Sequence, residues 1–424
     1  MVEPQYDVIV IGGGPGGATA ATLVAQRGHQ VLLLERSENP RFKIGESLMP
    51  ATYWTLQRLG MLPKLKASHF PRKYSVQFYS KSGKASAPFY FSETDPEESS
   101  QTWQVLRSEF DALLLDNARE HGVEVRRGAT VRDVLFDGER AAGVRADFGG
   151  EGQRELSCRV VVDASGQSAI LGRKLGLRQP DPELRKAAVF SHFRGALRDP
   201  GIDEGATLVI YARDGVSWFW HIPLPEDKVS VGVVGSIDAL ITDRAGDPQL
   251  ILDEEIAHCA EIQRRVAGAH QLFPAQVTRD FSYRSSRIAG DGWVLVGDAF
   301  GFLDPIYSSG VFLALKSGEL AADSVNDALA AGEVTAARLG AHGPRFLAGM
   351  EAMRKLVYAF YEPQFSFAQF LRRFPDTRLD LIHLLTGNVF RSSNGLFESM
   401  GQMARLPAEA RLETDPAAAA GGGT

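Results

Sequence analysis

Residues Tyr6 to Gly17, with the sequence YDVIVIGGGPGG, decide the fold of this chain. The first six residues are mostly apolar and β-branched and are followed directly by glycines, which predicts a buried parallel strand. The glycines fit the pattern G-x-G-x-x-G, and an alanine-rich helix over 18–27 and an apolar strand over 30–34 follow. This order of strand, glycine-rich turn, helix and strand predicts a βαβ unit that binds a dinucleotide.

The glycines of this motif have separate expected roles. Gly12 permits a tight turn, Gly14 lets the backbone approach a pyrophosphate, and Gly17 allows the helix to pack closely, while the helix N-terminus faces the anion. Glu35 lies 18 residues after Gly17, at the end of the second strand, where its carboxylate can accept hydrogen bonds from a ribose diol. The alternative is a glycine-rich turn without a ligand, and the unit by itself is also compatible with NAD.

Composition excludes several classes of function. The chain has 424 residues and a net charge of −6, which argues against a nucleic-acid binder with a basic stripe. Its two cysteines, Cys158 and Cys259, are far apart and lack metal-ligand spacing, so we expect no bound metal and a reducing, cytoplasmic location. No apolar run approaches the roughly 18 residues that a membrane span needs.

The pattern along the chain predicts an α/β fold of interleaved parts. Strands are expected over 74–91, 123–148 and 186–235, and helices over 51–65, 108–122, 250–267, 311–331 and much of 345–403. We expect a doubly wound, Rossmann-like layer, a mainly antiparallel β substrate domain and a helical C-terminal segment. The expected boundaries are 1–72, 101–185 and 280–335 for the nucleotide-binding domain, 73–100 and 186–279 for the substrate domain, 336–408 for the helical segment and 409–424 for a disordered tail.

Later segments indicate which dinucleotide is bound. Residues 161–166 (VVDASG) and 296–299 (VGDA) are strand ends with small residues, Asp298 is placed to reach a ribityl chain, and Arg107 is a candidate phosphate partner. In this order they resemble the FAD-binding motifs of the flavoprotein monooxygenase superfamily, with its para-hydroxybenzoate hydroxylase-like fold, from residue 6 to about 330. The resemblance implies FAD, and without a second G-x-G-x-x-G unit we expect no separate nicotinamide domain.

Two further segments resemble the signatures of flavin-dependent halogenases. Residues 218–223 (WFWHIP) have the form W-x-W-x-I-P, and 302–310 (FLDPIYSSG) have the form F-x-x-P-x-x-S-x-G. The resemblance implies that reduced flavin and O2 convert chloride or bromide to hypohalous acid, and that Trp218 and Trp220 keep the organic substrate away from the flavin. The alternative for the tryptophans is a core strand with both rings on one face.

The same resemblance implies a halide site and a lysine. Backbone N–H groups at the start of the helix after Ser308 favour an anion. Residues 41–50 (RFKIGESLMP) resemble the GES loop of the phenol- and pyrrole-type branch, in which a phenylalanine and then a lysine follow, here Phe70 and Lys73. Lys73 would hydrogen-bond hypohalous acid or form a haloamine, although the glycines that relatives often have around this lysine are missing. A solvated lysine is the alternative, and Lys43 is the reserve candidate.

The resemblance assigns the following site residues. The expected FAD site comprises Gly12, Gly14, Pro15, Gly17, Ala18, Glu35, Arg36, Arg41, Arg107, Val131, Asp298, Pro305, Gly310 and Val311. The expected catalytic residues are Lys73, Trp218, Trp220 and Ser308, and the expected halide contacts are Ser309 and Gly310.

One difference from the tryptophan halogenases indicates the class of substrate. Tryptophan halogenases carry a glutamate just before the motif serine, and this chain has Tyr307. That favours a phenolic, pyrrolic or other electron-rich aromatic substrate, in this branch often tethered to a carrier protein, with FADH2 supplied by a separate reductase. The alternatives are an aromatic hydroxylase, a prenyl reductase of the geranylgeranyl reductase kind and an inactive flavin carrier. We expect the aromatic residues of 358–370 to serve helix packing, and His192, His221 and His383 to be structural.

Overall fold

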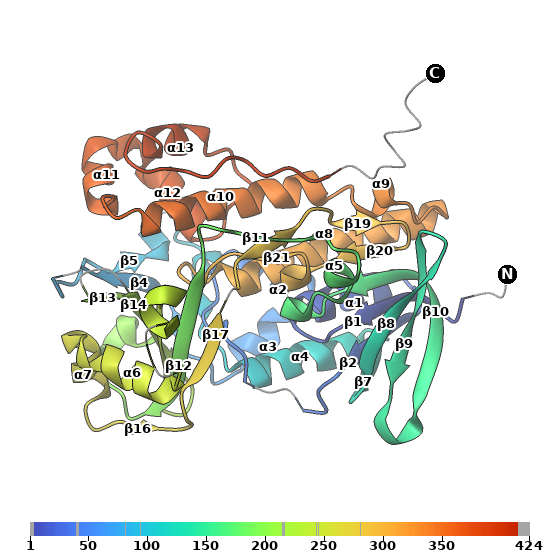
Figure 1. Ribbon diagram of the computed structural model, residues 1–424, viewed down its shortest axis with the longest axis horizontal. Helices are drawn as coiled ribbons and strands as arrows, with labels where there is room; N and C mark the ends of the chain where they lie inside the picture. Colours follow the sequence, from blue (N-terminus) through green and yellow to red (C-terminus); the bar gives the residue numbers. More distant parts are fainter. Residues whose placement is uncertain are drawn as a thin grey trace.

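The structure is a computed structural model that describes residues 4–39, 42–80, 82–93, 95–213, 217–242, 244, 246–279 and 281–413. Two large sheets and a group of C-terminal helices make up the molecule (Figure 1). Of the predicted tail, residues 414–424 lie outside the described part of the chain.

The first sheet contains the predicted βαβ unit. Its strand order is β19-β20-β10-β1-β2-β7, and the five strands from β20 to β7 run parallel to their neighbours. The bounds are β1 Tyr6–Ile11, β2 Val31–Glu35, β7 Glu124–Arg127, β10 Gln153–Asp163, β19 Ala289–Gly290 and β20 Trp293–Leu295, with β8 Thr130–Asp137 and β9 Arg140–Asp147 extending β10 as antiparallel strands. The run from Val8 to Ile11 is buried, as expected for a strand covered on both faces.

Helices cover this sheet, and glycines set how closely two of them approach. Helix α1 (Pro15–Ala25) packs against α8 (Ser309–Ala331). A Cβ atom at Gly318 would lie 2.4 Å from the carbonyl oxygen of Gly16, so only glycine permits this approach. Since α1 begins within the glycine turn and α8 begins at the last two residues of the 302–310 motif, their contact fixes the two motifs relative to each other.

The second sheet supplies the opposite wall of the site. Its order is β16-β12-β15-β14-β13-β4-β5, and β17 also pairs with β12. The bounds are β4 Ser75–Tyr79, β5 Phe89–Tyr90, β12 Lys186–Arg194, β13 Thr207–Ala212, β14 Ser217–Leu224, β15 Lys228–Ser236, β16 His270–Gln271 and β17 Gln276–Arg279. Every strand pair except β13 with β4 is antiparallel, as the alternating pattern predicts.

Two small sheets complete the strands. Strand β3 (Arg72–Lys73) pairs with β6 (Thr102–Trp103), and β11 (Arg178–Pro180), β18 (Tyr283–Ser285) and β21 (Gly301–Phe302) form a second small sheet. An isolated bridge also joins Ser47 to Gln104. The GES loop, Lys73 and the segment after β6 therefore lie together.

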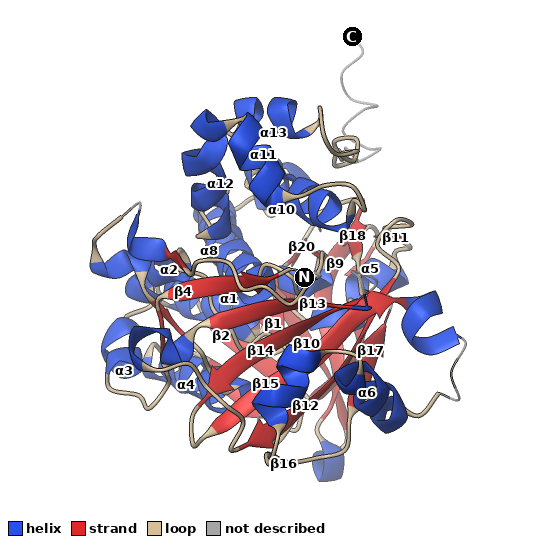
Figure 2. Ribbon diagram, turned by 90° about the vertical axis from the view of Figure 1, so that its left-hand side faces the viewer, coloured by secondary structure: helices blue, strands red, loops and turns tan. Residues whose placement is uncertain are grey.

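The remaining helices lie at the periphery. Their bounds are α2 Thr52–Arg58, α3 Leu62–Lys66, α4 Arg107–Glu120, α5 Ile170–Lys174, α6 Pro248–Ala257, α7 Ala260–Val266, α9 Ala336–Leu339, α10 Gly343–Tyr361, α11 Phe367–Arg373, α12 Arg378–Leu385 and α13 Asn394–Met400. Helices α10 to α13 form one layer above the two sheets (Figures 1 and 2). Among the described residues, no helix combines the length and apolarity needed to cross a bilayer.

Two helix predictions are wrong in detail. The helix expected over 51–65 is divided into α2 and α3, because Gly60 adopts a φ of +72° that ends the first helix. The helix expected over 250–267 is divided into α6 and α7, because Cys259 is extended and restarts the chain as an N-cap. The other predicted helices and strands are present, with shifted ends.

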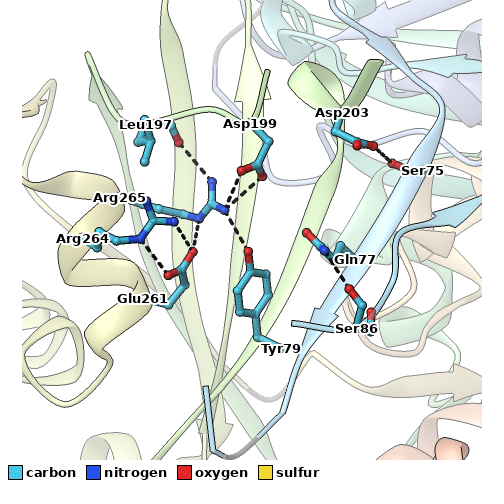
Figure 3. A network of polar contacts seen from close by, with 10 residues as sticks. All are labelled: Ser75, Gln77, Tyr79, Ser86, Leu197, Asp199, Asp203, Glu261, Arg264 and Arg265. Atoms are coloured by element: carbon cyan, nitrogen blue, oxygen red, sulfur yellow. Dashed lines mark hydrogen bonds and ion pairs between the residues drawn. The ribbon is translucent and has the colours of Figure 1, made fainter. Parts of the chain in front are cut away.

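A buried arginine ties the loop before β13 to the second sheet (Figure 3). Arg265 of α7 is 1% exposed and donates to both carboxylate oxygens of Asp199 and to the hydroxyl of Tyr79, each at 3.0 Å. It also donates to Glu261 at 2.7 Å. A guanidinium suits this site because its planar donors reach several acceptors at once.

Replacing this arginine should destabilise the protein. Arg265→Met leaves Asp199 without this partner and Glu261 with Arg264 alone, and we expect the free energy of unfolding to fall by about 3 kcal/mol in urea titrations. Arg264→Met is the matched control, since Arg264 binds the same Glu261 from an exposed position and should change stability by less than about 1 kcal/mol. Equal effects of the two substitutions would contradict this role of Arg265.

Candidate active site between the two sheets

A cavity of about 920 Å³ is lined by residues of both large sheets. The first sheet contributes the glycine turn and the end of β2, and the second contributes side chains of β12, β13, β14 and β17. The loop at 42–47 and the start of α8 also reach it. This volume is within the range of cofactor and substrate sites and lies where the parallel strands end.

The glycine turn has the shape of a ligand cradle. Gly12 has a φ of +100°, and a Cβ atom there would lie 2.4 Å from the carbonyl oxygen of Ala164. A Cβ atom at Gly17 would lie 2.0 Å from the carbonyl oxygen of Gly12. A Cβ atom at Gly14 would instead meet no protein atom within 4 Å, and Gly14 faces the cavity. Gly12 and Gly17 thus serve the fold, while the open space at Gly14 fits a dinucleotide.

Glu35 lies at the edge of this cradle as a carboxylate. Its oxygens accept hydrogen bonds from the backbone N–H groups of Gly13 at 2.8 Å and Ser37 at 2.9 Å. Burial raises the pKa of Glu35, but these hydrogen bonds outweigh it and hold the pKa below its usual value. The group therefore remains an acceptor at neutral pH, as binding to a ribose diol requires.

Arg107 lines the cavity but already has protein partners. Its guanidinium donates to both oxygens of Asp111, at 2.9 and 3.1 Å, and to the carbonyl oxygen of Ile44 at 2.6 Å. It therefore holds the GES loop against α4, and its contact with a phosphate stays a prediction. Burial raises the pKa of the nearby Asp298 to about 6, although the charge of Arg107 lowers it.

The two tryptophans of the W-x-W motif form one wall. Both side chains point to the same face of β14 and line the cavity, with ring centroids 6.2 Å apart. Trp218 donates its indole N–H to Tyr361 at 2.9 Å, and Trp220 donates to Ser230 at 3.1 Å. A Cβ atom at position 232 would lie 2.2 Å from the ring of Trp220, so Gly232 makes room for it. A hydrogen bond therefore holds the indole N–H group of each tryptophan, and the absence of a side chain at Gly232 leaves room for the ring of Trp220.

Lys73 is buried rather than solvated. It is 2% exposed, and its ammonium donates to the Ser47 hydroxyl at 2.8 Å and to the Leu48 carbonyl at 3.0 Å. Burial lowers the pKa of Lys73 to about 7. Lys73 does not itself line the cavity, whereas Ser47, which it contacts, does. The reserve candidate Lys43 is 40% exposed and pairs with Asp111 at 3.8 Å.

The second halogenase motif reaches the cavity with only part of its residues. Ser308 has a φ of +56° and directly precedes α8, and it lines the cavity together with Gly310. Ser309 is buried in the first turn of α8 and is not part of the lining. Of the two predicted halide contacts, Gly310 lines the cavity and Ser309 does not, and the halide site itself stays a prediction.

The predicted site residues divide into three groups. Those at the cavity are Gly12, Gly14, Pro15, Glu35, Arg36, Arg107, Val131, Trp218, Trp220, Asp298, Pro305, Ser308, Gly310 and Val311. Those beside or behind its lining are Gly17, Ala18, Lys73 and Ser309. Arg41 lies outside the described residues.

The structure also brings in polar residues that the sequence did not suggest. Glu46 of the GES loop is buried and hydrogen-bonds Nε2 of His192 at 2.7 Å. Asp304 accepts from the hydroxyl of Tyr361 at 3.0 Å, and burial raises the pKa of Asp304 to about 7. Glu46 and Asp304 each belong to a quoted motif, but no local pattern identifies their partners, and that of Glu46 lies 146 residues away.

Two of the expected structural roles can be compared with the geometry. Phe360 stacks on Tyr211 with centroids 5.2 Å apart and meets the ring of Trp218 edge-on, so the C-terminal aromatic residues pack behind the tryptophan wall. His221 is buried, and burial lowers its pKa to about 3. It stays neutral at physiological pH, which suits a structural histidine.

Comparisons with known proteins agree with this geometry. The family model described as FAD binding domain matches residues 5–322. The chain is 30% identical to a 1H-pyrrole-2-carbonyl-[peptidyl-carrier protein] chlorinase of Pseudomonas fluorescens, over 98% of this chain and 96% of the relative. It is 36% identical to the corresponding brominase of Pseudoalteromonas luteoviolacea, over 77% of this chain and 78% of the relative.

Solved structures of flavin-dependent halogenases are also similar to this fold. A flavin-dependent brominase superimposes with a TM-score of 0.83 at 32% identity, covering 94% of this chain and 98% of that chain. The myxobacterial chondrochloren halogenase superimposes with a TM-score of 0.80 at 32% identity, covering 96% and 94%. The similarity thus extends over both sheets and the C-terminal helices.

Proposed function

The chain belongs to the flavin-dependent halogenases, enzymes built on the FAD binding domain, and we propose that it uses reduced FAD, O2 and chloride or bromide to halogenate an electron-rich aromatic ring through hypohalous acid. The observation that carries this proposal is the tryptophan wall of β14 on one side of a cavity whose other side is the dinucleotide cradle. Pyrrolic and phenolic rings are the proposed substrate class. A pyrrole on a carrier protein is the first to test, because two relatives are named for that substrate.

The residues of the cradle fit FAD. Gly14 leaves space for a pyrophosphate beside the N-terminus of α1, and the ionised Glu35 provides an acceptor for a ribose diol. When bound and reduced, FAD would supply two electrons that reduce O2 to the peroxide level, at which it can oxidise the halide to hypohalous acid. The chain's own contribution on this side is to hold the cofactor at the start of α8, where the backbone N–H groups favour a halide.

The other residues separate and direct the reactants. Trp218 and Trp220 are anchored by hydrogen bonds to Tyr361 and Ser230 and keep the organic substrate on the far side of the wall. Halide oxidation and ring halogenation then occur on different sides. Lys73, which donates to the cavity-lining Ser47, stabilises the hypohalous acid or carries the halogen as a haloamine. With a pKa of about 7, both the ammonium and the amine are accessible near neutral pH.

The mass of the product tests this function. The purified protein should be incubated with FAD, NADH, a flavin reductase, O2, chloride or bromide, and candidate pyrroles and phenols, both free and carrier-bound. We expect the chlorine or bromine isotope pattern in the product. A mass gain of one oxygen would identify a hydroxylase instead, and gain of hydrogen without O2 consumption would identify a reductase of the prenyl reductase kind.

A separate flavin reductase is the proposed protein partner. The sequence holds one G-x-G-x-x-G unit, which the cradle at Gly12 to Gly17 uses for FAD. We therefore expect NADPH alone to reduce the bound flavin slowly in stopped-flow absorbance, and an added reductase to restore turnover. Rapid bleaching by NADPH that an aromatic substrate accelerates would favour the hydroxylase.

A further inference from the structure

Buried hydrogen bonds link Gln104 to Lys73 through two hydroxyl groups at the cavity wall. The amide nitrogen of Gln104 donates to the carbonyl oxygen of Gly205 at 2.8 Å and to the hydroxyl of Thr207 at 2.9 Å. The hydroxyls of Thr207 and Ser47 are 2.9 Å apart, and Lys73 donates to Ser47 at 2.8 Å. All four side chains are buried.

The carbonyl of Gly205 sets the orientation of the Gln104 amide. A carbonyl oxygen only accepts, so Gln104 must turn its NH2 group toward it, and the second N–H of that group points to Thr207. The Thr207 hydroxyl therefore accepts from Gln104, which fills one of its two lone pairs. Either hydroxyl of the Thr207–Ser47 pair can donate to the other, and we infer the direction in which Thr207, polarised by Gln104, donates to Ser47. The oxygen of Ser47 then accepts two hydrogen bonds, from Thr207 and from Lys73, which fills both of its lone pairs.

The proton of Ser47 is the one that remains to be placed. Within the described part of the chain, the contacts of the Ser47 side chain are those with Thr207 and Lys73, and both fill acceptor positions. Ser47 and Thr207 line the cavity, and Lys73 lies behind them. The hydroxyl proton of Ser47 is thus available to a ligand in the cavity.

The backbone holds this donor in place. Ser47 and Gln104 form an antiparallel bridge, Leu48 donates its N–H to the carbonyl of Trp103 at 3.1 Å, and Val105 donates to the carbonyl of Glu46 at 2.7 Å. A donor that is already oriented needs no reorganisation when charge develops on its partner.

We propose that Ser47 is a catalytic residue that donates a hydrogen bond to the oxygen of hypohalous acid, and that Gln104 and Thr207 are positioning residues that aim its proton into the cavity. This inference rests on the proposed halogenase function. An electron pair of the aromatic ring forms the carbon–halogen bond, the oxygen–halogen bond breaks, and the oxygen leaves as hydroxide, which takes up the displaced ring proton to become water. Ser47 stabilises the negative charge that develops on this oxygen.

A comparison of variants separates this role from simple packing. Ser47→Ala removes the donor. Gln104→Met frees the lone pair of Thr207 that Gln104 fills and removes the donor that polarises this hydroxyl, which favours acceptance of the Ser47 proton by Thr207 and turns that proton away from the cavity. In the double variant Gln104→Met/Thr207→Val, position 207 no longer has an acceptor, and the proton returns to the cavity. Thr102→Val is the matched control, because it removes an equally buried hydroxyl from the neighbouring strand β6.

Each variant is assayed for bound FAD by absorbance, for O2 uptake and for halogenated product per O2 consumed. We expect Ser47→Ala to lower the product yield per O2 on the order of 100-fold and Gln104→Met about tenfold, with FAD and O2 uptake retained. The double variant should give more product than Gln104→Met, and Thr102→Val should match the parent protein.

The outcomes distinguish this inference from the function on which it rests. If the parent protein gives no halogenated product with any halide, the proposed function fails and the inference with it. If the parent protein halogenates and Ser47→Ala does so equally well, only the inference fails. A double variant that is no better than Gln104→Met would show that Gln104 and Thr207 serve packing and would overturn their positioning role.

Discussion

Lys73→Met should still bind FAD and consume O2 but should yield on the order of 100-fold less halogenated product. The substitution keeps an apolar chain of similar length in a site where the native side chain is 2% exposed, and it removes the donor that holds Ser47. Lys73→Arg should also be poor, since a guanidinium is planar, cannot readily lose its proton and has a different reach. Product mass and oxygen uptake are measured side by side for each variant.

The matched control is Lys43→Met. Lys43 also follows the first βαβ unit but is 40% exposed and pairs with Asp111, so its loss should affect FAD binding or reduction rather than halogen transfer. Substantial halogenation by Lys73→Met would refute the assignment. Loss of FAD and of O2 uptake in Lys73→Met would show instead that Lys73 serves the cofactor.

A pH titration of stability tests whether burial lowers the pKa of Lys73 in the folded protein. Because burial lowers the pKa of Lys73 from 10.5 to about 7, the unfolded chain binds a proton between these pH values that the folded protein does not. The native protein should therefore gain stability relative to Lys73→Met as the pH rises from 7 to 10, by a few kcal/mol in total. Parallel urea-derived stability curves over this range would show that Lys73 titrates normally in the folded protein.

Gly14→Val should abolish stoichiometric FAD binding while leaving the fold intact. A Cβ atom at Gly14 meets no protein atom within 4 Å, and the backbone φ of −72° suits valine, so the substitution places no strain on the chain. The side chain would instead occupy the space proposed for the pyrophosphate. We expect FAD affinity to fall about 100-fold or more, on the order of 3 kcal/mol, in a fluorescence titration.

Gly17→Ala provides the contrast. Its Cβ atom would lie 2.0 Å from the carbonyl oxygen of Gly12, so this smaller substitution should lower the melting temperature as well as FAD binding. If Gly14→Val retains FAD at full occupancy, the cofactor is not held at this turn. If Gly14→Val unfolds, the space beside Gly14 serves the fold rather than a ligand.

Much of the fold could be predicted because its signals are local. The strand Tyr6–Ile11 and the glycine turn are adjacent in the sequence, and their residue types, a mostly apolar and β-branched run followed by glycines, indicate these conformations locally. The parallel order of β20, β10, β1 and β2 follows from the same pattern of apolar runs ending in small residues. The helices expected over 51–65 and 250–267 are each divided in the structure, although their apolar residues recur with a continuous helical period. The conformation of one residue, Gly60 in the first and Cys259 in the second, interrupts the helix.

The site was predictable only in part. The motif residues at Gly14, Trp218 and Gly310 do reach one cavity, as their resemblance to halogenase signatures implies. Arg107 was predicted to contact a phosphate, but its guanidinium already donates hydrogen bonds to Asp111, one helical turn further on. A spacing of four residues on a helix permits such a pair, but the sequence does not indicate whether a protein carboxylate or a ligand phosphate is the partner.

The sequence by itself determined the nucleotide-binding architecture and the halogenase signatures, because each depends on residues within one short segment. Only the tertiary structure decided the surroundings of Lys73. Its partner Ser47 lies 26 residues away, Ser47 meets Thr207 across 160 residues, and Gln104 meets Thr207 across 103. Such contacts exist only once two sheets have closed over a common cavity, and the same closure removes water from Lys73 and lowers its pKa. No local pattern of residue types carries that information, since burial is a property of the whole folded chain.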